Sequence, residues 1–225
     1  MNRCVLFDTE TTGLDPELGD RVIEVAALEL VNDLPTGRHF HALVDPERDV
    51  PEEATRIHGF TAAHLAGKPK FAEIANGLVE FFADARLIAH NAAFDFRFLD
   101  AEFGRLGLAV LDQARMIDTL ALAKKRFPGM PNSLDALCRR FAIDLSQRKT
   151  HNALLDCQLL AKVYVELIGG RQHGLVLATI GPSTPIEIYT RVGSRTIRVL
   201  TPGAAEIAAH QAMLARLRDP IWSMD

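Results

Sequence analysis

The chain has 225 residues, of which 48% are hydrophobic and 24% charged, and its net charge is −4. These values are typical of a soluble globular protein with one sizeable core, and the negative charge gives no overall attraction to nucleic acid. No stretch approaches the roughly 18 apolar residues that span a bilayer, and the first apolar run is too short for a signal peptide, so we expect no membrane contact.

The apolar pattern predicts an α/β fold that opens with an antiparallel meander of three strands. The expected strands are 4–7, 21–31, 40–44 and 87–89, and the expected helices are 51–57, 61–66, 71–82, 94–106, one that follows Ser133, and 152–168. Ser133 is a good N-cap residue, and the pair Gly169-Gly170 ends the last of these helices.

The character of the chain changes after residue 170. Glycine and proline are frequent, helical periodicity is lost, and two strand-like runs follow at 186–189 and 196–200. A final helix is expected from Thr201, with Pro202 at its first helical position, to about residue 218. We therefore predict three parts, namely a main domain at 1–170, a linker at 171–185 and a tail at 186–225.

Three cysteines, Cys4, Cys138 and Cys157, are too widely spaced for a disulfide framework or a zinc site. We expect them to be small buried core residues in the reducing cytoplasm. Basic residues gather between Arg115 and Lys149. They fit equally a solvated helical surface and a rim that follows phosphate groups.

Asp8 and Glu10 follow the first apolar run and lie two residues apart. On an extended strand both side chains point to the same face, where their mutual repulsion raises the pKa of each unless a cation binds. Paired carboxylates suit Mg²⁺ or Mn²⁺. An isolated pair of this kind is usually a pair of surface acids, but the following Thr-Thr-Gly-Leu favours a functional site.

Asp95 and the pair His151 and Asp156 are the other candidates for chemistry. Asp95 falls in the first turn of an expected helix, where the helix dipole favours an anion. His151 and Asp156 would lie about 140° apart on one continuous helix, so they converge only if His151 precedes that helix. A glycosidase uses two carboxylates, whereas two-metal phosphodiester hydrolysis with a general base uses four carboxylates and one imidazole.

The segments 7–14, 90–95 and 151–156 resemble the Exo I, Exo II and Exo III motifs of DEDDh-type 3′–5′ exonucleases. Within that family the chain is most similar to the epsilon, or proofreading, subunits of bacterial DNA polymerase III. The similarity is strong over about 1–170 and includes the segments 40–47, 57–59, 132–138 and 151–164. It implies a ribonuclease-H-like fold, a mixed sheet flanked by helices.

The resemblance implies two divalent ions, Mg²⁺ or Mn²⁺. Asp8, Glu10 and Asp156 would hold the tightly bound ion, Asp8 would bridge to the second, and Asp95 would orient that ion largely through water. His151 would deprotonate the nucleophile.

The resemblance also implies a pocket for the terminal nucleotide. Its residues would be Asp8, Glu10, Leu14, Glu53, His58, Asn91, Phe94 and Asp156. Four of these have simpler interpretations that stay open: Leu14 and Phe94 as core residues, Glu53 as an acid on a helix surface, and Asn91 as a helix cap.

The tail resembles the polymerase-binding end of the same subunits. Trp222 would anchor it on the catalytic (alpha) subunit of the replicative polymerase, unless the tail packs back on the main domain. Gln172, Leu175 and Leu177 resemble a sliding-clamp-binding peptide, although a plain linker is the alternative.

The carboxylates by themselves predict metal-assisted phosphodiester cleavage. The resemblance implies a proofreading exonuclease that removes nucleoside 5′-monophosphates from single-stranded or frayed DNA 3′ ends at the bacterial replisome. One alternative is a free-standing exonuclease in DNA repair or RNA trimming. Another is a non-catalytic assembly factor, which the complete set of five catalytic groups disfavours.

Overall fold

A computed structural model of the chain describes residues 2–148, 150–169 and 201–218. The chain divides into two compact units, 1–176 and 177–225. The first contains strands β1 (Arg3–Thr11), β2 (Val22–Val31), β3 (Leu34–Leu43), β4 (Arg86–Ala89) and β5 (Met116–Asp118), the 3₁₀ helices η1 (Pro16–Leu18) and η2 (Gln113–Arg115), and helices α1 (Glu52–His58), α2 (Ala62–Leu65), α3 (Phe71–Phe82), α4 (Ala92–Arg105), α5 (Thr119–Arg126), α6 (Leu134–Arg140) and α7 (Ala153–Leu167). The second contains α8 (Ala204–Leu214).

The five strands form one mixed sheet in the order β3-β2-β1-β4-β5. β1, β2 and β3 are antiparallel neighbours, which confirms the expected meander, and β4 and β5 run parallel to β1. The central strand β1 is buried on both faces, with Val5 and Phe7 on one and Cys4 and Leu6 on the other.

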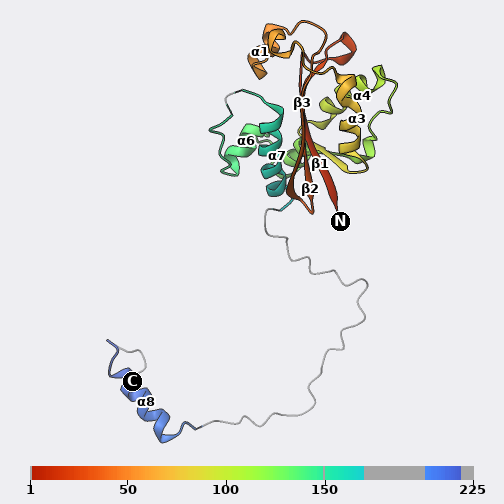
Figure 1. Ribbon diagram of the computed structural model, residues 1–225. Helices are drawn as coiled ribbons and strands as arrows, with labels where there is room; N and C mark the ends of the chain where they lie inside the picture. The colour runs from red at the N-terminus through yellow and green to blue at the C-terminus, as the bar shows by residue number, and fades with distance from the viewer. Residues whose placement is uncertain (1, 149, 170–200, 219–225) are drawn as a thin grey trace. The chain divides into compact units, whose positions relative to one another are not determined.

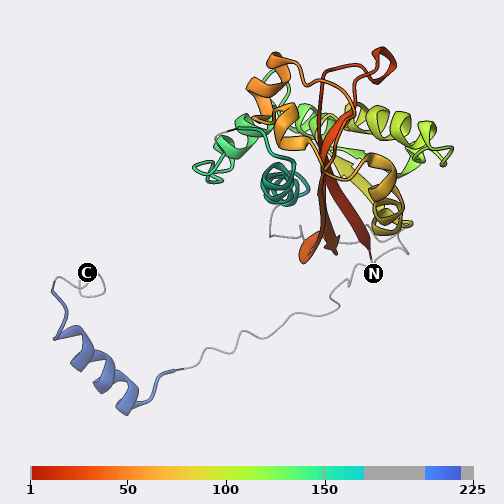
Figure 2. The ribbon, with the colours of Figure 1, turned by 45° about the horizontal axis from the view of Figure 1, so that its top comes forward.

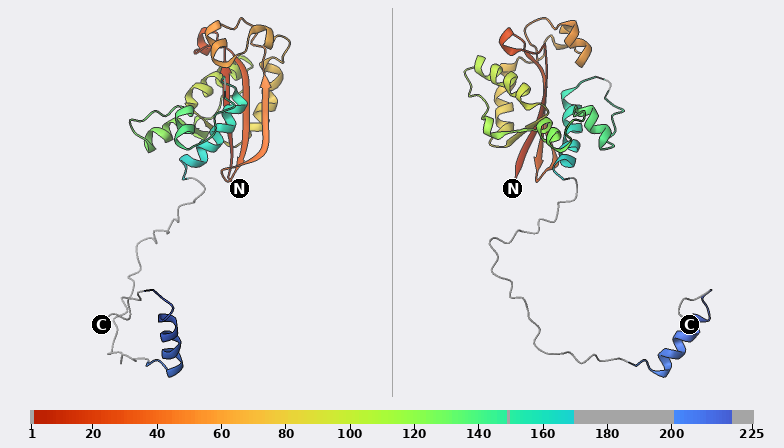
Figure 3. Two further views of the ribbon diagram at one scale, coloured as in Figure 1. Left: turned by 90° about the vertical axis from the view of Figure 1, so that its left-hand side faces the viewer. Right: turned by 180° about the vertical axis from the view of Figure 1, so that it is seen from behind.

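Helices cover both faces of this sheet. α3 and α4 pack on the face of Phe7, and α5, α6 and α7 pack on the face of Leu6. Figures 1 and 2 show α6 and α7 on one side of the sheet and α3 and α4 on the other, and the right-hand view of Figure 3 shows the same layers from behind. The three predicted core cysteines are buried, all in the core cluster between the sheet and helices α5, α6 and α7.

Some predicted elements were wrong in extent, and two elements of the structure were not predicted. β3 begins at Leu34, not residue 40, because its first six residues are exposed and lack an apolar pattern. β5 has only three half-buried residues, and α5 has few large apolar side chains, so neither gave a periodic signal. Pro202 is not in the last helix, since Glu206 accepts a hydrogen bond from the N–H of Gly203 (2.8 Å) and α8 begins at Ala204.

The predicted linker at 171–185 and the strand-like runs at 186–189 and 196–200 lie outside the described residues, as do Gln172, Leu175, Leu177 and Trp222. Among the residues that are described, no helix combines the length and apolar character needed to cross a membrane.

Candidate active site

A cleft of about 1030 Å³ opens at the edge of the sheet where β1 and β4 end. Because these two strands are parallel, their carboxyl ends lie at the same edge, the usual place for a site in an open α/β sheet. All ten site residues predicted within the main domain line this cleft: Asp8, Glu10, Leu14, Glu53, His58, Asn91, Phe94, Asp95, His151 and Asp156.

β1 carries two of the acids at its carboxyl end. Asp8 lies opposite Ala26 and Glu10 opposite Glu24 in the pairing with β2. Since side chains alternate along a strand, Asp8 and Glu10 share the face of Leu6, which α7 covers. The expected common orientation of the two carboxylates is therefore present.

Asp95 reaches the same edge from the opposite layer. It lies in the first turn of α4 and is buried. Its Oδ1 accepts hydrogen bonds from the backbone N–H (3.1 Å) and the hydroxyl (2.7 Å) of Thr9. Thr9, between the two acids of β1, thus fastens α4 to the strand, a role that its sequence position did not reveal.

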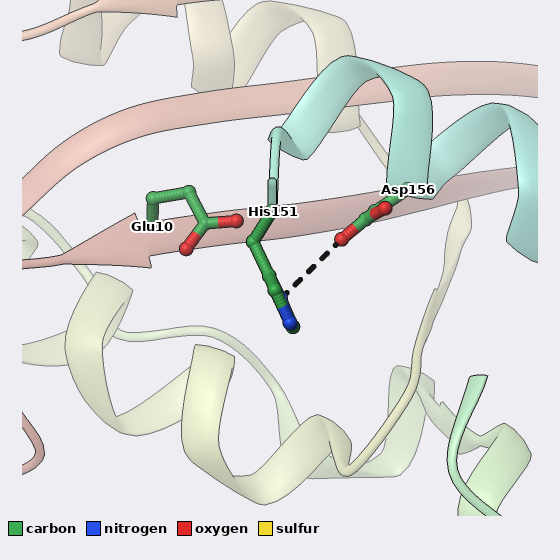
Figure 4. A group of neighbouring side chains, drawn as sticks. All are labelled: Glu10, His151 and Asp156. Atoms are coloured by element: carbon green, nitrogen blue, oxygen red, sulfur yellow. Dashed lines mark ion pairs between the residues drawn. The ribbon is translucent and has the colours of Figure 1, made fainter. Parts of the chain in front are cut away.

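His151 and Asp156 converge at the start of α7. The side chain of Asn152 caps this helix by accepting from the N–H of Leu155 (3.0 Å), so His151 precedes the helix as expected. Its Nδ1 lies 3.6 Å from Oδ2 of Asp156. Glu10, His151 and Asp156 each offer a ligand atom, and these atoms lie within 4.8 Å of one another; Figure 4 shows the three side chains converging.

Glu24 anchors the start of α7 to the sheet. This fully buried acid accepts hydrogen bonds from Nδ2 of Asn152 (2.9 Å) and from the N–H of Ala153 (3.0 Å). It thereby sets the position of the helix end that carries His151 and Asp156. Glu24 interrupts the apolar run of β2, and a buried carboxylate needs hydrogen-bond partners. This position in the sequence could therefore have identified Glu24 as a residue that contacts another element.

Burial and mutual repulsion disfavour the ionised forms of Asp8, Glu10 and Asp95 and raise their pKa values. Burial, followed by the charges of Asp95 and Glu10, raises the pKa of Asp8 well above its usual range. Burial and the charge of Asp156 raise the pKa of Glu10 to about 8. Burial also raises the pKa of Asp95 to about 7, against the opposing hydrogen bonds from Thr9. Oxygen ligands with this need for a cation fit a divalent metal ion.

A family model described as Exonuclease matches residues 5–164. The chain belongs to this exonuclease family. It is 45% identical over 222 residues to the DNA polymerase III subunit epsilon of Rickettsia conorii, covering 96% of each chain.

Two solved structures share the fold. Exonuclease X in complex with 5′ overhanging duplex DNA has 26% identity and a TM-score of 0.57, and the match covers 75% of this chain and 91% of that one. The nuclease domain of 3′hExo, a DEDDh family member bound to rAMP, has 17% identity and a TM-score of 0.62, with 74% and 92% covered. The fold is therefore ribonuclease-H-like, and the chain is a metal-dependent 3′–5′ exonuclease.

The remaining cleft residues of the exonuclease differ in exposure. Leu14 is 77% exposed, so it is not a core residue. Phe94 is partly buried against the core and also lines the cleft. Asn91 is the residue before α4, but its side chain makes no capping hydrogen bond. Glu53 is an exposed acid in the first turn of α1, and it faces the cleft.

His58 has a donor that the described residues leave unpaired. Its Nδ1 accepts a hydrogen bond from the N–H of Phe60 (3.0 Å), so in the neutral ring the hydrogen lies on Nε2. Nε2 is buried and has no hydrogen-bond partner among the described residues. The His58 side chain also lines the cleft.

The metal-free exonuclease is expected to lose thermal stability as pH rises. Glu10 and Asp95 have folded-state pKa values above their ordinary 4.5 and 3.8, so their ionisation destabilises the folded state from those values up to about 8 and about 7. Melting in EDTA should show a fall in Tm on the order of 10 °C between about pH 5 and pH 8. Mg²⁺ should restore stability most at the higher pH, and Glu10→Gln should flatten the profile. An unchanged profile in that variant would contradict a destabilising role for the Glu10 charge.

Proposed function

We propose that this exonuclease proofreads for a replicative DNA polymerase, removing nucleoside 5′-monophosphates from single-stranded or frayed DNA 3′ ends with two divalent ions, Mg²⁺ or Mn²⁺. The observation that carries the proposal is that four carboxylates and one imidazole line a single cleft, with ligand atoms of Glu10, His151 and Asp156 within 4.8 Å of one another.

Asp8, Glu10 and Asp156 would hold one ion, Asp8 would also contact the second, and Asp95 would orient that second ion largely through water. Bound there, the ions would lower the pKa of the attacking water and stabilise charge on the leaving oxygen. His151 would take the proton from that water. Burial and the positive charge of Arg148 lower the pKa of His151, which keeps the imidazole neutral and able to accept a proton at neutral pH.

The other cleft residues would hold the end of the strand. Leu14 and Phe94 offer apolar surface to a base or sugar. The His58 imidazole would contact a phosphate or sugar oxygen from the wall of the cleft, and Glu53 and Asn91 would add polar contacts. Apolar and stacking contacts of this kind hold any sequence, because they do not read base edges.

The tail is proposed to bind the polymerase. The similarity to the Rickettsia conorii subunit covers 96% of this chain, so it includes the tail as well as the nuclease domain. Helix α8 has no buried residue among those described, and an 11-residue helix is marginally stable alone. We propose that 186–225 docks on the polymerase through Trp222, that Gln172, Leu175 and Leu177 in the 171–185 linker bind the sliding clamp, and that the protein works in the cytoplasm.

Deleting residues 171–225 is expected to abolish co-purification with the polymerase while leaving hydrolysis of single-stranded DNA intact, because the ten cleft residues all lie before residue 170. Pull-down from a cell lysate and a nuclease assay on both chains measure the two effects. Trp222→Ala in the full chain is the matched point variant and should weaken co-purification alone. Unchanged co-purification of the deleted chain would favour a free-standing exonuclease in repair or RNA trimming.

A further inference from the structure

Arg148 places its guanidinium among the candidate metal ligands. Its Nε and Nη2 donate to the two carboxylate oxygens of Asp156 at 2.6 and 2.7 Å. Its Nη1 donates to Oδ1 of Asp135 (2.7 Å), and Nη2 lies 3.1 Å from Nδ1 of His151. The side chain is only 9% exposed, so this cation is buried and held on three sides.

The bond between Arg148 and Asp156 competes with metal binding. Both oxygens of Asp156 accept from the guanidinium, yet Asp156 also belongs to the group whose ligand atoms lie within 4.8 Å of one another. A divalent ion bound through Asp156 would stand beside a second positive charge, and repulsion between two cations is strong where water is scarce. The guanidinium and the metal ion are therefore alternative counter-ions for one carboxylate.

Asp135 offers the guanidinium a second anchor. It lies in the first turn of α6, lines the same cleft and is 38% exposed. Arg148 can turn away from Asp156 and keep its bond to Asp135, which avoids the large cost of an unpaired buried charge.

We propose that Arg148 is a positioning residue, which holds Asp156 and His151 in place in the metal-free exonuclease. When the ion binds, Arg148 releases Asp156 and keeps its hydrogen bond to Asp135. The inference rests on the metal-ligand role proposed above for Asp156. It predicts that removing Arg148 strengthens metal binding, the opposite of what loss of a residue that merely supports the site would do.

The test measures Mn²⁺ affinity in the full-length, metal-stripped protein, with free Mn²⁺ followed by electron paramagnetic resonance. Arg148→Gln is expected to bind Mn²⁺ roughly tenfold more tightly than the unaltered protein. Arg148→Lys keeps the charge but lacks the two-pronged contact and should fall between them. Arg139→Gln is the matched control, because it also removes a positive charge near Asp135 (3.8 Å), but from a side chain that is 74% exposed. The Mn²⁺ affinity of this variant should equal that of the unaltered protein.

Thermal melting gives a second readout. Arg148→Gln should melt lower than the unaltered protein without metal, so its gain in Tm on adding Mn²⁺ should be larger. If this variant folds only with Mn²⁺, that supports the proposal, and Arg148→Lys supplies the metal-free comparison. Equal or weaker Mn²⁺ binding by Arg148→Gln, beside normal binding by the unaltered protein, overturns the inference. No binding by the unaltered protein overturns the proposed metal site itself.

Discussion

Replacing Asp8 with asparagine is expected to lower kcat for hydrolysis of single-stranded DNA by roughly a thousandfold or more. Asp8 is proposed to touch both ions, and an amide supplies no negative charge to hold them. A 3′-labelled oligonucleotide assayed with saturating Mg²⁺ gives the rate, and titration with Mn²⁺ separates loss of binding from loss of chemistry.

A structural defect would produce a different pattern. The pKa of Asp8 is raised by burial and by its acidic neighbours, so Asp8→Asn should melt at or above the Tm of the unaltered protein in EDTA at neutral pH. Glu80→Gln is the matched control, since Glu80 is an exposed acid on α3 that does not line the cleft. Full activity of Asp8→Asn, with the control also active, would rule out the proposed two-ion mechanism.

The sequence allowed prediction of those parts of the site that depend on local periodicity. Alternation along β1 placed Asp8 and Glu10 on one face. The angle of about 140° that one continuous helix would put between His151 and Asp156 placed His151 ahead of α7, which the Asn152 cap confirms. The apolar spacing of α4 placed Asp95 in the first turn. These features depend on backbone geometry within a few residues, which the sequence specifies directly.

The groups that bring these elements together could not be predicted in the same way. Thr9 contacts Asp95 across 86 positions, and Glu24 contacts Asn152 across 128. Arg148 was one of several basic residues in its stretch, and nothing local distinguished it from Arg139, which is exposed. Such partners are chosen by tertiary packing, so only the assembled fold identifies them.

Gly13, in the segment 7–14 that resembles the Exo I motif, is another residue whose role depends on a tertiary contact. A Cβ at this position would lie 2.2 Å from Oδ2 of Asp20. Asp20 in turn accepts from the hydroxyl of Thr12 (3.2 Å) and the N–H of Asp15 (3.1 Å). A side chain at position 13 would therefore displace the Asp20 carboxylate from the turn after β1, a reason for glycine that the spacing of the motif did not reveal.

Replacing His151 with glutamine is expected to lower kcat by roughly 10²- to 10⁴-fold, the range for loss of a general base. The unaltered enzyme should gain activity as pH rises and the imidazole loses its proton. Because burial and Arg148 lower the pKa of His151, the rise should end at a lower pH than a free imidazole would give. His151→Gln should retain Mn²⁺ binding through the four carboxylates and lose this rise.

The pH dependence of the rate separates a base from a residue that only supports the site. It is measured with saturating Mg²⁺, so that titration of the metal-free acids does not contribute. His39→Gln is the matched control, since His39 is exposed on β3 and does not line the cleft. If His151→Gln is slow but keeps the pH dependence of the unaltered enzyme, another group accepts the proton. The loop before α7 would then matter for the placement of Asp156 and not for proton transfer.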